Sequence, residues 1–186
     1  MKPTVTFNTL ETERLVLREI NPEIYHLAYS LWKDEAIISF FGLHSHEELA
    51  SEKIKFEDGM TTFNKTFLFF HLLDKSTQAL IGWCGFHTCY LPHKRAEIGY
   101  EIYDAQKRGK GLMKEAMIRI IQYGFETMQL NRIEALIGPD NIPSIRLIRS
   151  LGFKEEGIMR ENYFKNNGFE DSIIFSMLES EYRNNN

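Results

Sequence analysis

Hydrophobic and polar residues alternate along this chain with two different periods, and these periods predict its secondary structure. Stretches that alternate at every second residue, or are apolar almost throughout, are typical of β-strands. The predicted strands span residues 13–20, 66–73, 79–90, 96–103 and 132–137, and residues 153–164 and 169–178 form a final hairpin. Asn166, Asn167 and Gly168 supply the turn chemistry that such a hairpin requires.

Other stretches place apolar residues three or four positions apart, as amphipathic helices do. These helices are predicted at residues 22–32, 45–64, 109–128 and 142–151. Asn21 with Pro22, Ser45 with Glu48, and Asn141 carry the residue types that begin helices. The pattern therefore predicts helices between the first two strands, after the fourth strand and after the fifth.

The order of these elements predicts one mixed sheet with helices on its faces. Three consecutive strands in the middle of the chain favour an antiparallel meander, and strand–helix–strand units on either side favour parallel pairing. We therefore expect a mixed α/β fold with about seven strands and about four helices. Residues 37–41 are expected to be an apolar patch outside the helices, and residues 180–186 a frayed polar tail. No repeat or linker divides the chain, so residues 1–186 are expected to form a single domain.

Composition narrows the class of protein. The net charge of −4 argues against nucleic acid as a partner, because nucleic-acid-binding proteins need a basic face. Cys84 and Cys89 share one predicted strand at an odd spacing, so we expect them on opposite faces, unpaired, and without the further ligands of a metal site. Residues 1–10 lack a secretion signal, and no apolar run approaches the roughly 20 residues that span a bilayer. We expect a soluble, cytoplasmic protein.

A turn with two glycines, residues 106–111, joins the fourth strand to the long helix. The free N–H groups of a first helical turn favour anions, and Gly109 and Gly111 let a phosphate approach the backbone closely. Lys107, Arg108 and Lys110 add positive charge beside this predicted anion site. A Walker-type phosphate loop is excluded because no Gly-Lys-Ser/Thr closes the motif.

The spacing Gln106-x-x-Gly109-x-Gly111 resembles the motif of the GNAT superfamily of acyl-CoA-dependent N-acyltransferases. The resemblance extends along nearly the whole chain and favours the Rim-type branch, the ribosomal-protein N-terminal acetyltransferases and their relatives. The segments that carry it are residues 12–18, 81–82, 96–100, Asn141 with Ser144, 151–153, 156–160, Gly168 and Asp171.

This resemblance implies acetyl-CoA as the donor and a single GNAT domain with a splayed sheet. Backbone amides of the glycine turn would hold the pyrophosphate, and the pantetheine arm would lie where the fourth strand parts from the fifth. The implied coenzyme-binding residues are Ile102, Tyr103, Asp104, Gln106, Lys107, Arg108, Gly109, Lys110, Gly111, Asn141 and Ser144. For Asn141 a plain helix cap is an equally good interpretation, and the two roles are compatible.

Acetylation of an amine requires a group that removes a proton, since an ammonium ion has no lone pair. Glu97 resembles the glutamate that serves as base in several family members, although a solvated side chain or a pair with Arg95 would also explain it. Glu101, on the same strand face, is a weaker alternative. Many members have a tyrosine acid where Ile148 stands here, so Ser144 becomes the candidate donor to the leaving thiolate.

The acceptor is not encoded in a motif. The Rim-like resemblance favours a protein N-terminal α-amine, and a small amine such as a polyamine remains open. Aromatic residues at 40–42 and 83–90, together with Tyr163 and Phe164, are candidates for the walls of the acceptor site. A CoA-responsive module without turnover is the alternative function, and a homodimer is plausible by analogy. We expect no metal, because the histidines have no suitable spacing.

Overall fold

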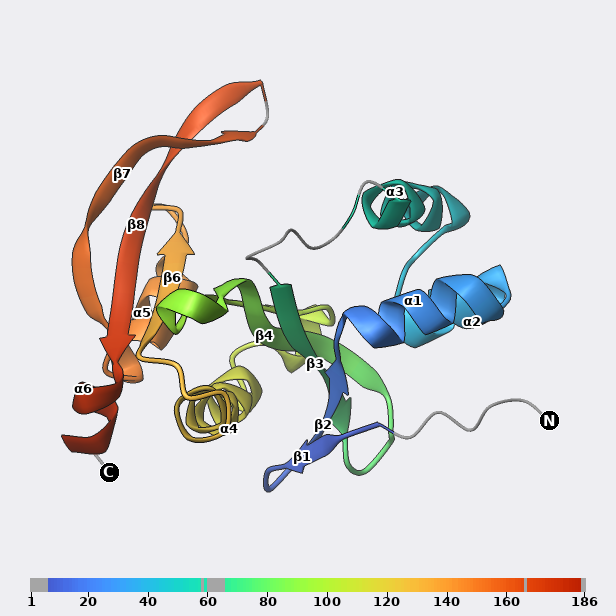
Figure 1. The fold of residues 1–186 in the computed structure, drawn as a ribbon, viewed down its shortest axis with the longest axis horizontal. Coiled ribbons are helices and arrows are strands. Elements are labelled where there is room, and N and C mark those ends of the chain that lie inside the picture. Colours follow the sequence, from blue (N-terminus) through green and yellow to red (C-terminus); the bar gives the residue numbers. More distant parts are fainter. Residues whose placement is uncertain (1–6, 58, 60–65, 166, 185–186) are drawn as a thin grey trace.

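The computed structural model describes residues 7–57, 59, 66–165 and 167–184 (Figure 1). Within them the strands form one sheet of eight in the order β1-β2-β3-β4-β5-β6-β8-β7. The strands are β1 (Thr9–Glu11), β2 (Leu15–Ile20), β3 (Thr66–Asp74), β4 (Leu80–Tyr90), β5 (Arg95–Ile102), β6 (Arg132–Ile137), β7 (Lys154–Lys165) and β8 (Gly168–Leu178). The α-helices are α1 (Pro22–Leu31), α2 (Asp34–Phe41), α3 (His46–Glu57), α4 (Leu112–Glu126), α5 (Ile142–Ser150) and α6 (Glu179–Asn184).

The mixed α/β fold predicted from the sequence is confirmed, but the counts were too low. β1 was missed because three residues are too short for an alternating pattern to show. The apolar patch at residues 37–41 is the second half of α2, which begins at Asp34 and ends at Gly42 in the left-handed conformation. The tail predicted to fray instead forms α6, where the Leu178 N–H donates to the Glu181 carboxylate. All three extra elements are short, which makes their periodicity hard to detect.

The expected strand directions are partly correct. β3, β4 and β5 form the antiparallel meander, and β5 pairs parallel with β6 across α4, as predicted. Parallel pairing of β2 with β3 was wrong, since Ile20 at the end of β2 faces Phe69 near the start of β3. The helices α1 and α2 pack on the face of β3 that carries Phe67 and His71, which contact Tyr25 of α1 and residues 40–41 of α2. Figure 1 shows α1, α2 and α3 grouped on the side of these strands away from α4.

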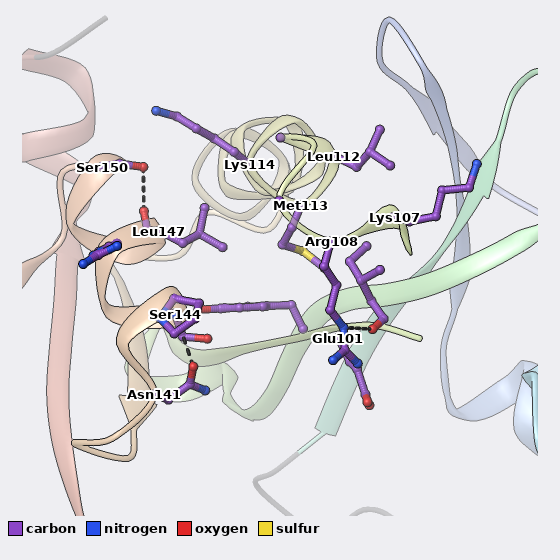
Figure 2. A pocket seen from close by; sticks show the side chains of 16 residues that line it. Glu101, Lys107, Arg108, Leu112, Met113, Lys114, Asn141, Ser144, Leu147 and Ser150 are labelled. Atoms are coloured by element: carbon purple, nitrogen blue, oxygen red, sulfur yellow. Dashed lines mark hydrogen bonds between the residues drawn. The ribbon is translucent and has the colours of Figure 1, made fainter. Parts of the chain in front are cut away.

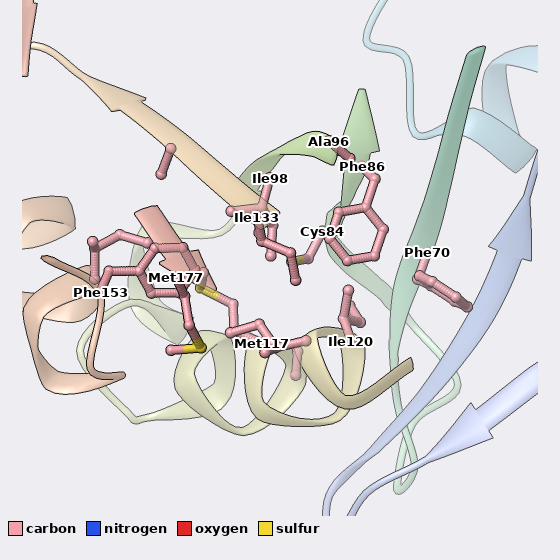
Figure 3. Packing of buried hydrophobic residues seen from close by; sticks show 14 of the residues in the cluster. Phe70, Cys84, Phe86, Ala96, Ile98, Met117, Ile120, Ile133, Phe153 and Met177 are labelled. Atoms are coloured by element: carbon pink, nitrogen blue, oxygen red, sulfur yellow. The ribbon is translucent and has the colours of Figure 1, made fainter. Parts of the chain in front are cut away.

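The larger hydrophobic cluster lies between the sheet and α4 (Figure 3). Met117 and Ile120 of α4 are fully buried against Phe86 and its neighbours, so the apolar face of this helix packs as its periodicity predicts. Burial of side chains of this size contributes about 2 kcal/mol each. The cluster holds α4, and therefore the glycine turn before it, rigidly against the strands.

Both cysteines are free and buried in this same cluster. The expectation that they face opposite sides was wrong because β4 contains an irregularity between His87 and Tyr90, where Thr88 has a positive φ of 50°. An extra residue in a strand reverses the alternation that follows it. Cys84 and Cys89 therefore end on the same face of the sheet, where neither is exposed.

A smaller cluster joins α1, α2 and α3 to the end of β2. Its buried residues are Ile20, Ala28, Ile37, Phe41 and Leu49. Asn21 caps α1 as predicted, accepting a hydrogen bond from the Ile24 N–H at 3.0 Å. Ser45 accepts from the Glu48 N–H at the start of α3. Residues 58 and 60–64 of that predicted helix lie outside the described residues.

Candidate active site

β5 and β6 part soon after they begin, and this parting creates the site. Their parallel pairing is limited to Arg95, Ala96 and Glu97 opposite residues 132–134. Beyond Glu97, β5 follows β4 and β6 follows β8, so the two strands diverge. Tyr103 donates its N–H to the Ile81 carbonyl of β4. Because the backbone groups of successive residues in a strand point to alternate sides, the N–H and C=O groups of Tyr100 and Ile102 point away from β4, toward the gap. The gap is therefore lined by polar backbone at its edge.

The glycine turn forms one wall of a cavity of about 620 Å³ beside this gap. Gly109 and Gly111 have positive φ angles of 72° and 78°, which favour glycine over any residue with a Cβ. A Cβ placed on Gly109 would meet no other atom within 4 Å, so the turn is open on that side. Gly111 is the N-cap of α4, and the first intrahelical bond is donated by the Glu115 N–H. The N–H groups before Glu115 are left for an external anion.

Two of the basic residues in the turn have internal partners. Lys107 forms an ion pair with Asp74 at 2.8 Å, an interaction that lowers the pKa of Asp74. Arg108 donates from Nε to the Ile102 carbonyl at 2.9 Å, and so closes the turn onto the end of β5. Both still line the 620 Å³ cavity, together with Lys114 of α4 and Arg146 of α5, which the sequence did not single out.

The turn is also tied to the first hairpin through Glu115. Its carboxylate accepts from Thr12 Oγ1 at 2.5 Å, from the Arg14 N–H at 2.7 Å and from Arg14 Nε at 2.6 Å. Burial opposes ionisation, but these three hydrogen bonds outweigh it and lower the pKa of Glu115. Arg14 also donates to the Lys110 carbonyl at 3.0 Å. The N-terminus of α4 is therefore held in place by residues nearly 100 positions earlier in the chain.

Helix α5 forms the opposite wall of the same cavity. Asn141 caps it by accepting from the Ser144 N–H at 3.3 Å, so the predicted cap is present. Figure 2 shows Asn141, Ser144 and Leu147 facing Arg108 and Glu101 across the cavity. Asn141 and Ser144 also line a second cavity, of about 330 Å³, between β5 and β6. The two cavities meet at these residues and at Tyr100.

Glu97 lies in the second cavity with only 15% of its side chain exposed. Burial, and secondly the neighbouring Glu134, raise the pKa of Glu97 to about 7. Arg95 is not its partner, because the Arg95 guanidinium bonds to Glu134 at 3.1 Å. His87 lies beside Glu97, with its Nδ1 3.7 Å from the Glu97 carboxylate. Burial lowers the pKa of His87. This arrangement can hold a carboxyl group that changes protonation near neutral pH.

Gly99 allows the rings of His87 and Trp83 to lie close to β5 near Glu97. A Cβ at this position would approach the rings of His87 and Trp83 to 2.9 and 3.0 Å. Trp83 lines the second cavity and also a third one, of about 460 Å³, below α1 and α3. The third cavity thus shares Trp83 with the second cavity and Glu101 with the first.

The third cavity is aromatic and acidic. Its carboxylates are Glu48 and Glu52 of α3 and Glu101 of β5. Phe41, Gly42 and Trp83, from segments expected near the acceptor, also line it. Tyr25, Tyr29 and Tyr103 also line it, together with His44 and His71. Burial, and secondly these carboxylates, raise the pKa of Tyr29 and of Tyr103 to about 12. Glu52 is paired with Lys55 at 2.5 Å, so the negative charge beside the gap comes mainly from Glu48 and Glu101.

Not every predicted coenzyme residue lies at the first cavity. Ile102, Lys107, Arg108, Gly109, Gly111, Asn141 and Ser144 line it. Tyr103 instead turns its ring into the acidic cavity, and Asp104 caps the short turn by accepting from the Gln106 N–H at 2.8 Å. Gln106 and Lys110 are exposed beside it.

The sequence interpretation placed no role at the site on Tyr100 or Glu52, and gave Glu48 only a role in beginning α3. Tyr100 falls on the apolar face of β5, and its hydroxyl group was the only feature in the sequence that could have indicated a role at the site. Glu48 and Glu52 come from α3, and nothing local in the sequence indicates that this helix reaches the gap. Tyr163, which was a candidate wall residue, lines the cavity around Glu97.

A splayed mixed sheet with a glycine turn before its central helix defines an acyltransferase of the acyl-CoA-dependent type. Residues 14–154 match the family described as Acetyltransferase (GNAT) domain, and the chain belongs to this family of acetyltransferases. Members use acetyl-CoA as co-substrate. The resemblance stated from the sequence is thereby confirmed.

Three similar proteins illustrate the range of the family. The uncharacterized N-acetyltransferase p20 of Bacillus licheniformis is 34% identical over 176 residues, which cover 94% of this chain and 98% of that protein. The ribosomal N-acetyltransferase-like protein YdaF of Bacillus subtilis is 32% identical over 104 residues, or 56% of each chain. Mutant forms of the spermidine/spermine N-acetyltransferase SpeG of Vibrio cholerae share the fold with a TM-score of 0.68 and 22% identity, covering 92% of this chain and 99% of theirs.

Helices long and apolar enough to cross a membrane are absent from the described part of the chain.

Proposed function

We propose that this chain transfers an acetyl group from acetyl-CoA to a primary amine by direct attack in a ternary complex, with Glu97 as the base. The observation that supports this is the position of Glu97 in the gap between β5 and β6, with a pKa of about 7. An acceptor amine must lose a proton before it attacks. A carboxylate with this pKa accepts that proton at neutral pH far more readily than an ordinary glutamate does.

The walls of the first cavity fit acetyl-CoA. The open turn at Gly109 and the N-terminus of α4 suit a pyrophosphate, and Arg108, Lys114 and Arg146 add positive charge around it. The edges of β5 at Tyr100 and Ile102 offer backbone groups to an extended arm in the gap, as a paired strand would. Such an arm would bring its thioester to the junction of the two cavities, beside Asn141 and Ser144.

The positions of the thiols support direct attack. The neutral amine nitrogen forms a bond to the thioester carbonyl carbon and then loses its additional proton to water, and the carbon–sulfur bond breaks with its electron pair remaining on sulfur. An acyl-enzyme route would need a nucleophilic side chain in the gap. Cys84 and Cys89 are both buried in the core, and burial raises the pKa of each thiol, so neither is available as a thiolate.

We further propose that the acceptor carries a positive charge in addition to its reactive amine. The acidic cavity supports this, because Glu48, Glu52 and Glu101 would attract a second ammonium group and the tyrosine and tryptophan rings would contact its alkyl stem or its charge. A polyamine fits this description, as does a basic protein N-terminus. SpeG by its name acts on spermidine and spermine, and YdaF is ribosomal N-acetyltransferase-like.

The test is an acceptor screen with the purified full-length chain and acetyl-CoA, monitored by CoA release. The panel pairs spermidine with a monoamine of equal length, and a basic N-terminal peptide with its neutral counterpart. We expect turnover with spermidine or the basic peptide, and mass spectrometry would place the acetyl group on a primary amine. Binding of acetyl-CoA with no turnover across the panel would instead favour a CoA-responsive module.

A further inference from the structure

Tyr100 presents a buried hydroxyl at the junction of the two cavities. Its Oη is inaccessible to water and, within the described residues, has no partner in good hydrogen-bond geometry. The only other such side-chain atom in that part of the chain is Arg18 Nε, far from the gap. A buried hydroxyl left unpaired costs free energy, so an unpaired one at a candidate active site points to a role there.

Ser144 is the group that Tyr100 faces. Burial raises the pKa of Tyr100, and hydrogen bonding to the Ser144 hydroxyl acts in the opposite direction. The two hydroxyls are therefore close enough to interact, although they stand outside ideal geometry, and a rotation of one side chain would complete the bond. The backbone of Ser144 is meanwhile fixed by its N–H bond to Asn141.

The orientation of the Ser144 proton decides whether this serine can help the reaction. A serine hydroxyl is too weak an acid to protonate a thiolate fully, but it can donate a hydrogen bond as charge develops on sulfur. A serine in the first turn of a helix can instead turn its proton to a nearby backbone carbonyl. If Tyr100 donates to Ser144 Oγ, the serine proton is directed away from Tyr100 and toward the gap.

We propose that Tyr100 is a positioning residue that orients the Ser144 hydroxyl toward the sulfur of the departing coenzyme. The inference rests on the proposed acetyl transfer. The sulfur leaves with the electron pair of the broken carbon–sulfur bond, stabilised by the Ser144 hydrogen bond, and takes its proton from water afterwards. Tyr100 and Ser144 together supply a polar group for the sulfur, which Ile148, fully buried and apolar, does not provide.

The experiment is a double-mutant cycle of Tyr100→Phe and Ser144→Ala, measured as single-turnover acetyl transfer at saturating acetyl-CoA. We expect each single variant to slow transfer roughly 10-fold, less than general acid catalysis usually contributes, because a thiolate leaves readily. The double variant should be no slower than Ser144→Ala alone, because Tyr100 acts through Ser144. Affinity for acetyl-CoA and the melting temperature should change little.

Tyr123→Phe is the matched control, since Tyr123 lies on α4 against Phe70 and lines none of the three cavities of the site. It should retain the wild-type rate. Independent, multiplying losses in the double variant would overturn the proposal, as would an unchanged rate in Tyr100→Phe. A wild-type chain that transfers no acetyl group to any amine would instead refute the proposed function itself, so the two failures are distinguishable.

Discussion

Glu97 and Glu134 face each other on the last rung that joins β5 to β6 before the strands diverge. Their surroundings differ. Glu134 is bonded to Arg95 and Arg132, whereas Glu97 faces the cavity with His87 Nδ1 3.7 Å away. Two carboxylates this close disfavour simultaneous ionisation, and the one without an arginine is the one whose pKa rises, to about 7. Glu134 is therefore a structural carboxylate, and Glu97 is the one able to exchange a proton.

Activity should depend on pH through Glu97. The group is a base only when deprotonated, so kcat should rise as pH increases through about 7. Glu97→Gln should lower kcat by roughly 100-fold and remove this limb of the profile, with little change in acetyl-CoA affinity. The measurement is kcat at saturating amine from pH 5 to 9. If the Glu97→Gln variant kept the wild-type profile, Glu97 would be excluded as the base.

Stability should show the same ionisation without any substrate. Because the folded pKa of Glu97 lies above its ordinary value of 4.5, the folded state holds the proton more tightly than the unfolded chain. This contribution is fully present below about pH 4.5 and is lost as pH rises through about 7. Glu97→Gln has no group that ionises here, so only the wild type loses this contribution between pH 5 and 8. The melting temperature of the variant minus that of wild type should therefore rise over this range. A constant difference across that range would contradict the buried ionisation.

The glycine turn can be tested by Gly109→Glu. A side chain at φ 72° strains the backbone, and a carboxylate there repels an anion at the start of α4. We expect acetyl-CoA affinity to fall by at least about 100-fold, measured by calorimetry. Gly157→Glu is the control, because Gly157 of β7 also has a positive φ, of 151°, and open space around it, but lies outside the cavity. Equal losses in both variants would indicate a general effect on folding.

The contacts of Glu115 should stabilise the fold. Glu115→Ala removes a carboxylate that accepts three hydrogen bonds from Thr12 and Arg14, and should lower the free energy of unfolding by about 2 kcal/mol. Since the folded pKa of Glu115 is lowered, its contribution is present at neutral pH and is lost as pH falls. Urea denaturation at pH 7 and at pH 4 measures both. A penalty that did not shrink in acid would argue against the charged contact.

The acidic cavity predicts a contrast between acceptors. Glu52→Gln should raise KM for a diamine about 5-fold, the effect of one partly screened ion pair, and leave KM for a monoamine of equal length unchanged. Glu47→Gln, on the same helix but outside the cavity, should change neither constant. If Glu52→Gln altered both acceptors alike, the cavity would have no part in recognising a second charge.

The amino-acid sequence was sufficient for the parts of this protein that depend on neighbours along the chain. Alternation at every second residue identified the main strands, the cap residues Asn21 and Asn141 identified helix starts, and the two glycines marked the turn before α4. These signals are local because strand pleating, helix capping and positive φ angles are properties of a few consecutive residues. The order of motifs was enough to indicate the family.

Folding in three dimensions was needed for everything that depends on which distant groups meet. The raised pKa of Glu97 comes from burial and from Glu134, which is distant in the sequence but adjacent in the sheet. The sequence pattern indicates an ordinary core position for Tyr100, and only α5 places Ser144 beside it. The same pattern indicates a solvated helix residue for Glu52, and only the packing of α3 brings it to the acidic cavity. Burial and charge proximity are set by packing, and packing has no fixed spacing along the chain.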